Sequence, residues 1–153
     1  LKHHEFIISK YLEKVEDFGS ILEIGKKEII VESYINHIDK KFRYKGSLFF
    51  RKRNDIDDYL KKYEINYSHE IFPIYENLLK RLNNEYGIRK IQVDGLIYKD
   101  NEKFNFAPLI EFNYRKTFGE VGLKLNSLYA KNQFSRLIII NKNQFSANRY
   151  SQL

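Results

Sequence analysis

The sequence predicts a single α+β domain in which helices pack on one face of an antiparallel sheet. Three observations support this fold class. The apolar spacing switches several times between helical and strand periods, two strand-like runs are joined by a short polar turn, and no internal repeat or Gly/Ser-rich linker divides the 153 residues. Because 42% of the residues are hydrophobic, the chain can bury an ordinary core. We expect one domain over residues 1–153, with a loose polar tail at 142–153.

The first third of the chain is expected to contain one helix and two strands. Apolar residues recur every three or four positions over 4–18, which predicts an amphipathic helix that ends at Gly19. The β-branched and aromatic residues of 28–35 predict a buried strand, and 42–51 is expected to form another. The tyrosine-rich segment 54–66 is expected to be a loop or a short irregular helix.

A long helix should follow this segment. Ser68 is a good N-cap, Pro73 lies near the helix start, where a missing N–H is tolerated, and the apolar spacing continues to Tyr86. Gly87 is the expected left-handed terminator.

The last part of the chain should contain a hairpin, a helix and a strand. IQVDGLIY and FNFAPLIEFNY read as two strands joined by the turn KDNEK. A helix capped by Thr117 should extend to about Lys131 and carry Val121, Leu125 and Leu128 inward. SRLIIIN supplies a final strand.

The second hairpin strand carries an unusual polar row. Because side chains alternate along a strand, Glu111, Asn113 and Arg115 should share one face. The apolar alternates should be held in the core; they are Ile110, Phe112 and Tyr114.

The hairpin should bring Asp94, on its first strand, close to Glu111 and Asn113. Two carboxylates and an amide oxygen are hard ligands that suit Mg²⁺ or Mn²⁺, which also coordinate substrate phosphates. Arg115 could bind a phosphate through its planar guanidinium. Solvated carboxylates on an open sheet face are the alternative explanation of the same pattern.

EFNYR resembles the E-x-N-x-R signature of the ATP-grasp superfamily, the ATP-dependent carboxylate–amine and carboxylate–thiol ligases. The resemblance implies the C-terminal ATP-grasp subdomain, in which Glu111 and Asn113 bind magnesium and Asp94 completes the site. PLIEFNYRKTFGEVGLKL also resembles a branch of that superfamily in which a Thr-x-Gly segment follows the arginine.

VESYI, at residues 31–35, resembles the strand-end segment that holds adenine in the same superfamily. By that resemblance Glu32 lies near the adenine or ribose, and the backbones of Ser33 and Ile35 make the adenine hydrogen bonds. An edge-strand carboxylate or a salt-bridge partner is the alternative explanation of Glu32.

The resemblance implies a function for the whole set. The chain would be the ATP- and magnesium-binding part of a ligase that activates a small-molecule carboxylate as an acyl phosphate. Arg115 would stabilise that intermediate before an amine or another nucleophile attacks it. No glycine-rich loop precedes Glu32 and the chain contains no methionine. We therefore expect the C-terminal portion of a longer enzyme, inactive by itself.

Two other functions fit parts of the sequence. A restriction-endonuclease-like nuclease also places an Asp and then Glu-x-Lys on a hairpin, but Asn113 occupies the lysine position, so Lys116 or Arg115 would have to substitute. A basic nucleic-acid-binding module would fit the net charge of +7, with its clusters at 40–45 and 51–53. Solvated, lysine-rich surfaces explain that charge better.

The composition also bears on location. The chain has no cysteine, no apolar run approaches the roughly 20 residues of a membrane span, and the N-terminus lacks the apolar core of a signal peptide. We expect a cytoplasmic protein with no membrane partner.

Overall fold

The computed structural model describes residues 10–41, 43–129 and 134–139. The strands are β1 (Glu13–Ile24), β2 (Ile29–Ile38), β3 (Tyr44–Phe50), β4 (Lys90–Asp100), β5 (Lys103–Asn113) and β6 (Phe134–Ile138). The helices are α1 (Arg53–Leu60), α2 (Phe72–Tyr86) and α3 (Phe118–Tyr129), with a 3₁₀ turn at Lys61–Tyr63 and a π turn at Tyr67–Ile71. The predicted α+β class is therefore confirmed, whereas the tail at 142–153 lies outside the described residues.

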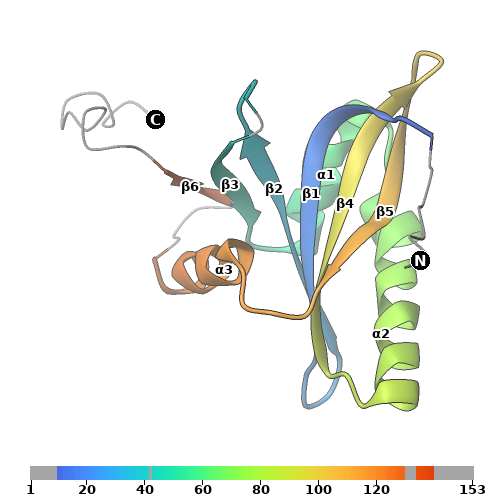
Figure 1. Ribbon diagram of the computed structural model, residues 1–153. Helices are drawn as coiled ribbons and strands as arrows, with labels where there is room; N and C mark the ends of the chain where they lie inside the picture. Colours follow the sequence, from blue (N-terminus) through green and yellow to red (C-terminus); the bar gives the residue numbers. More distant parts are fainter. Residues whose placement is uncertain (1–9, 42, 130–133, 140–153) are drawn as a thin grey trace, which may run out of the picture.

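All strands belong to one antiparallel sheet with the order β5-β4-β1-β2-β3-β6 (Figure 1). The predicted helix over 4–18 is wrong where it can be checked, because Glu13–Phe18 belong to β1, an inner strand of the sheet. Residues 4–9 of that prediction lie outside the described part. Gly19 is not a helix end: it pairs with Tyr34 of β2, and a Cβ on it would lie 2.4 Å from the Tyr34 ring. This mid-strand glycine gives the tyrosine ring room to lie across β1.

One face of the sheet carries the larger core. Phe18, Leu22 and Ile35 point to this side and pack against α1, α2 and the turns between them. Two buried α2 residues, Tyr75 and Leu79, complete the contact. α1 and α2 therefore cover the larger core on this face of the sheet.

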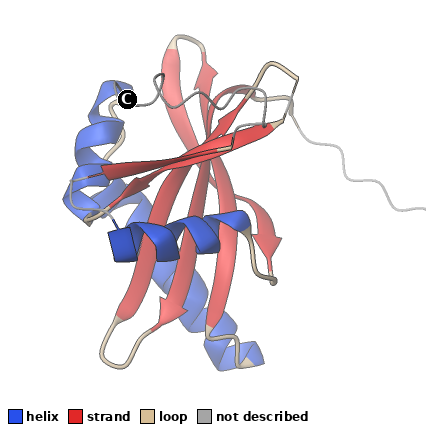
Figure 2. Ribbon diagram, turned by 90° about the vertical axis from the view of Figure 1, so that its left-hand side faces the viewer, coloured by secondary structure: helices blue, strands red, loops and turns tan. Residues whose placement is uncertain are grey.

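The opposite face carries α3, so the prediction that all helices pack on one face is wrong (Figure 2). Gly119 and Gly122 lie against the sheet, where Cβ atoms would come within 2.0 Å of the Tyr34 hydroxyl and 2.1 Å of the Phe49 ring. Two glycines one helical turn apart therefore let α3 approach these two aromatic rings. Leu123 fills the remaining contact.

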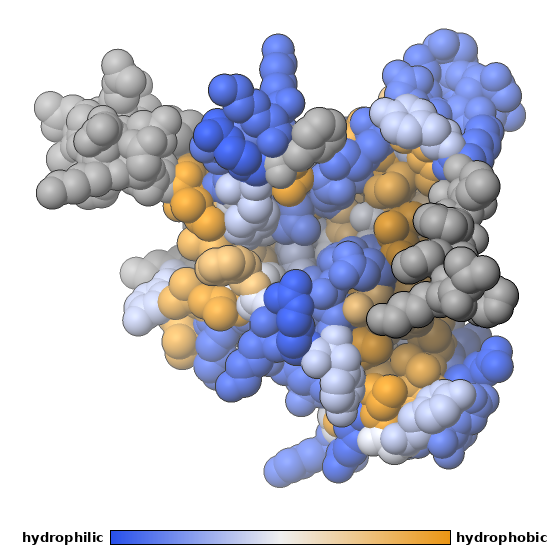
Figure 3. Space-filling view, in the orientation of Figure 1, coloured by the Kyte–Doolittle hydropathy of each residue, from blue (hydrophilic) through white to orange (hydrophobic). Residues whose placement is uncertain are grey.

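This packing turns the apolar stripe of α3 outward. Val121, Leu125 and Leu128 were predicted to face the core, but they are 52%, 42% and 61% exposed. Figure 3 shows apolar residues gathered over α3. The prediction failed because apolar periodicity assigns large side chains to the buried face, whereas this helix is buried through its glycines.

The hairpin is confirmed, with its turn at Asn101 and Glu102, both at positive φ (48° and 68°). The prediction for its apolar alternates is wrong: Ile110, Phe112 and Tyr114 are 54%, 45% and 75% exposed. β5 lies at the edge of the sheet and pairs with one neighbouring strand, β4.

The long helix is confirmed at its end and corrected at its start. Gly87 has φ 68° and its N–H bonds the carbonyls of Asn83 and Leu82. Ser68 is not the N-cap, because it lies inside the π turn, where its backbone N–H and hydroxyl both donate to Asp57. Asn66 caps that turn by accepting from the His69 N–H. Among the described residues, none of the helices is both long and apolar enough to cross a membrane.

Candidate functional site

The predicted metal ligands meet on the α3 face of the β4–β5 hairpin. Asp94 pairs directly with Glu111, and Gln92 pairs with Asn113 one step further along the same face. A bulge follows immediately: between the pairs Asp94–Glu111 and Leu96–Ala107, three residues of β5 (108–110) face one residue of β4, Gly95. The structure therefore brings the three predicted ligands together at an irregularity of the sheet, where bulges commonly redirect side chains.

Asp94 is the best-anchored group of this set. Its Oδ2 accepts a hydrogen bond from Asn113 Nδ2 at 2.7 Å, and its Oδ1 accepts one from Gln92 Nε2 at 2.9 Å. Partial burial raises the pKa of Asp94, and so do the nearby charges of Glu111 and Asp17. In the described ranges neither Asp94 nor Glu111 forms an ion pair. The site thus gathers negative charge with neutral donors around it.

Gln92 was not predicted to be a site residue, and Thr117 was predicted only as a helix cap. The Thr117 hydroxyl donates to Gln92 Oε1 and accepts a hydrogen bond from the Glu120 N–H at 3.3 Å, which confirms it as the cap of α3. Gln92 could have been predicted, since it lies two residues before Asp94 and alternation places both on one face of the strand. Asp17 was missed because its segment was predicted to be helical.

Arg115 lies just beyond the end of β5 and is exposed. Its positive charge lowers the pKa of Asp94, opposing the effect of burial. With Asn113, Lys116 and Thr117 it lines a pocket of about 490 Å³ between β4, the end of β5 and the start of α3. The predicted phosphate-binding arginine is therefore beside the carboxylates and accessible.

Glu32 lies on the same face but further away. Its partner on β1 is Ile21, which pairs in turn with Gln92, so Glu32 is three strands from Asn113, roughly 14 Å at the usual strand spacing. It lines a second pocket of about 500 Å³ with Lys90 and Lys124. Partial burial raises the pKa of Glu32, and the Lys90 charge lowers it.

Ser33 and Ile35 point to the other face of the sheet. The Ser33 hydroxyl is within 2.7 Å of both the Ser20 and the Tyr67 hydroxyls, in a buried chain under α2. Ile35 lies between Phe18 of β1 and Leu48 of β3, so its backbone N–H and C=O, which point to the same side, are used within the sheet. This placement does not favour the predicted adenine contacts.

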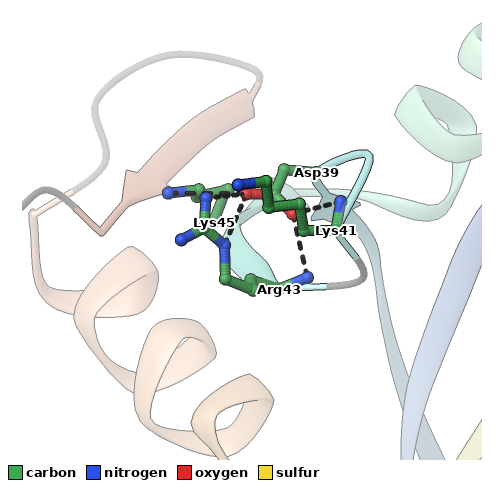
Figure 4. A network of polar contacts seen from close by, with 4 residues as sticks. All are labelled: Asp39, Lys41, Arg43 and Lys45. Carbon is green, nitrogen blue, oxygen red and sulfur yellow. Dashed lines mark hydrogen bonds and ion pairs between the residues drawn. The ribbon is translucent and has the colours of Figure 1, made fainter.

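The basic cluster of the β2–β3 hairpin is held by one carboxylate. Asp39 accepts hydrogen bonds from the backbone N–H groups of Lys41 and Arg43 and from the Arg43 guanidinium, and Lys45 Nζ lies 3.8 Å away (Figure 4). Hydrogen bonds from Arg43 lower the pKa of Asp39 to about 2. This single carboxylate offsets one of the four positive charges at 40–45, so the cluster keeps a net positive charge.

The carboxylate pair can be tested for its fit to a cation. Over residues 10–41, 43–129 and 134–139, no three His, Cys, Asp or Glu side chains form a metal-binding group. Asp94, Glu111 and the Asn113 amide do suit a Mg²⁺ ion, because Mg²⁺ commonly binds one or two carboxylates and completes its octahedron with water and substrate phosphates.

Comparison of the chain with family models, curated proteins and solved structures finds no match. The function has to be argued from the residues and geometry of this site.

Proposed function

We propose that this chain is the magnesium- and ATP-binding part of a ligase of the ATP-grasp type, which activates a small-molecule carboxylate for attack by an amine or another nucleophile. The observation that carries the proposal is the register of the hairpin. It sets Asp94 opposite Glu111, with Asn113 two residues further on the same face. This is the set that the E-x-N-x-R resemblance assigns to magnesium.

The charge distribution supports the proposal. Asp94 and Glu111 place two negative charges on neighbouring strands, and burial raises the pKa of Asp94. A divalent cation would offset both the repulsion and the loss of hydration. Mg²⁺ bound there with ATP would neutralise the terminal phosphates during phosphoryl transfer.

The chain's own residues would then have separate roles. Asp94, Glu111 and Asn113 hold the cation, whereas Arg115 presents an exposed guanidinium at the pocket edge. Its planar pair of N–H donors matches the oxygens of a phosphate or an acyl phosphate better than a lysine would. No nucleophilic side chain is required.

Calorimetric titration with ATP, with and without Mg²⁺, tests this function. We expect magnesium-dependent ATP binding that Glu111→Gln abolishes, because the substitution keeps the shape of the side chain and removes its charge. Glu102→Gln is the matched control, since Glu102 lies at the far turn of the same hairpin, where it pairs with Lys99 at 2.8 Å. Absence of ATP binding, or binding that Glu111→Gln leaves unchanged, would contradict the proposal.

Asn113→Lys separates the ligase from the nuclease. If the site holds Mg–ATP, a lysine at this position should abolish nucleotide binding through charge repulsion with the cation. If the site is a degenerate nuclease, the same substitution should instead create magnesium-dependent cleavage of duplex DNA. The second result would replace the proposed function.

A further inference from the structure

A directed chain of hydrogen bonds connects the start of α3 to the acidic pair. The Glu120 N–H donates to Thr117 Oγ1, the Thr117 hydroxyl donates to Gln92 Oε1, and Gln92 Nε2 donates to Asp94 Oδ1. Each group uses its donor toward Asp94 and its acceptor toward α3. The chain therefore has one direction, set by the backbone of the helix.

Gln92 cannot reverse in this arrangement. Its side chain is buried, with 8% of the residue exposed, and both ends of the amide are engaged. If the amide turned over, its oxygen would face the Asp94 carboxylate, which is unfavourable in a buried position. The Thr117 hydroxyl can both donate and accept, so it does not by itself exclude the reversed amide. With its oxygen held by Thr117, Gln92 presents its N–H₂ to Asp94 and fixes the orientation of that carboxylate.

The position of Thr117 is fixed in turn by the packing of α3 against the sheet. Gly119 and Gly122 bring the helix directly onto the rings of Tyr34 and Phe49, which are both 1% exposed. Since these rings are closely packed, they fix the distance between the first turn of α3 and the sheet.

We propose that Gln92, held by Thr117, is the positioning residue of the divalent-cation site: it orients the Asp94 carboxylate for the cation. The inference rests on the proposed function, because it assigns the cation to Asp94. Ligating carboxylates are commonly oriented by an outer shell of hydrogen bonds, and removing such a partner typically costs 10- to 100-fold in metal affinity.

Mn²⁺ affinity, measured from the electron paramagnetic resonance signal of the free ion, tests the proposal. Gln92→Met keeps the length of the side chain and removes both amide contacts, so we expect binding about 10-fold weaker than in the unmodified chain. Thr117→Val should weaken it in the same direction. Thr117→Ser, which keeps the hydroxyl, should restore it.

Two further measurements separate positioning from a purely structural role. Hydrogen exchange of the α3 amides without metal should be unchanged in Gln92→Met, because the bond between Thr117 and Glu120 remains. Tyr63→Phe is the control for general destabilisation: it removes a 2.5 Å hydrogen bond to Glu16 on the other face and should not change Mn²⁺ affinity.

The outcomes are distinct. Equal Mn²⁺ affinity in Gln92→Met and the unmodified chain would overturn the positioning role and leave the proposed function intact. The same conclusion follows if Gln92→Met changes only the exchange of α3. No Mn²⁺ binding by the unmodified chain would overturn the proposed function, and the positioning role with it.

Discussion

Replacing Gly122 with alanine should destabilise the protein, although the same change stabilises most helices. A Cβ at this position would lie 2.1 Å from Cζ of Phe49, and 2.7 and 2.9 Å from its Cε atoms. Ordinary carbon–carbon contact begins at about 3.5 Å, so the helix or the ring must move by about 1.4 Å. Phe49 is 1% exposed and cannot turn out into solvent.

The loss of stability is the difference between a gain in helix propensity and a cost of overpacking. Gly→Ala in a helix interior gains about 1 kcal/mol, and overpacking of a rigid core costs up to about 3 kcal/mol. The net loss should be about 2 kcal/mol of unfolding free energy. At this chain length that is a decrease of about 4–8 °C in Tm.

Urea unfolding followed by circular dichroism measures this difference. Ser127→Ala is the control, because Ser127 is exposed on the same helix and the substitution should gain up to about 0.5 kcal/mol from helix propensity alone. If Gly122→Ala were as stable as the unmodified chain, or more stable, α3 would not be seated on the sheet through its glycines.

Three further predictions concern Leu128, Ser33 and His37. Leu128→Ser should change the unfolding free energy by less than about 0.5 kcal/mol, because Leu128 is 61% exposed; a loss of several kcal/mol in urea unfolding would place it in the core after all. Ser33→Ala should cost about 1–3 kcal/mol in the same assay, because it removes a 2.7 Å hydrogen bond to the buried Tyr67 hydroxyl, and an unchanged midpoint would argue against that bond. Burial and the Arg136 charge lower the pKa of His37 below 6.5, so the unfolded chain takes up its proton first and stability should fall with pH from about 7.5 to about 5.5. His37→Gln should remove that part of the pH dependence, and an unchanged slope would contradict the assignment.

The local elements of the fold could be predicted from the sequence. The hairpin was found because its turn and the alternation of its strands are encoded within about 25 residues. The end of α2 was found because only a residue that tolerates positive φ fits after Tyr86, and Gly87 supplies it.

The non-local elements could not be predicted. The apolar residues of β1 fit both a helical and a strand spacing, and the choice is made by pairing with β2 and β4, whose partners lie far along the chain. Which face of α3 is buried depends on two rings from other strands. The exposure of β5 depends on its place at the sheet edge, which its own sequence does not specify.

The residues of the candidate site also fall into a predictable local group and a non-local group that could not be predicted. Asp94, Glu111 and Asn113 could be placed together because one hairpin carries all three. The role of Gln92 depends on Thr117 and the seating of α3, so only the alternation pointed to it. Asp17 joins the same face only because β1 is a strand.

The most direct test of the central claim is nuclear magnetic resonance of the labelled chain during titration with Mn²⁺. A bound paramagnetic ion broadens the signals of nearby amides, so the position of the cation is read without assuming an activity. We expect broadening to begin at Asp94, Glu111 and Asn113, and Glu111→Gln to remove it. Broadening centred elsewhere, or none in the unmodified chain, would contradict the claim that this hairpin is built to hold a divalent cation.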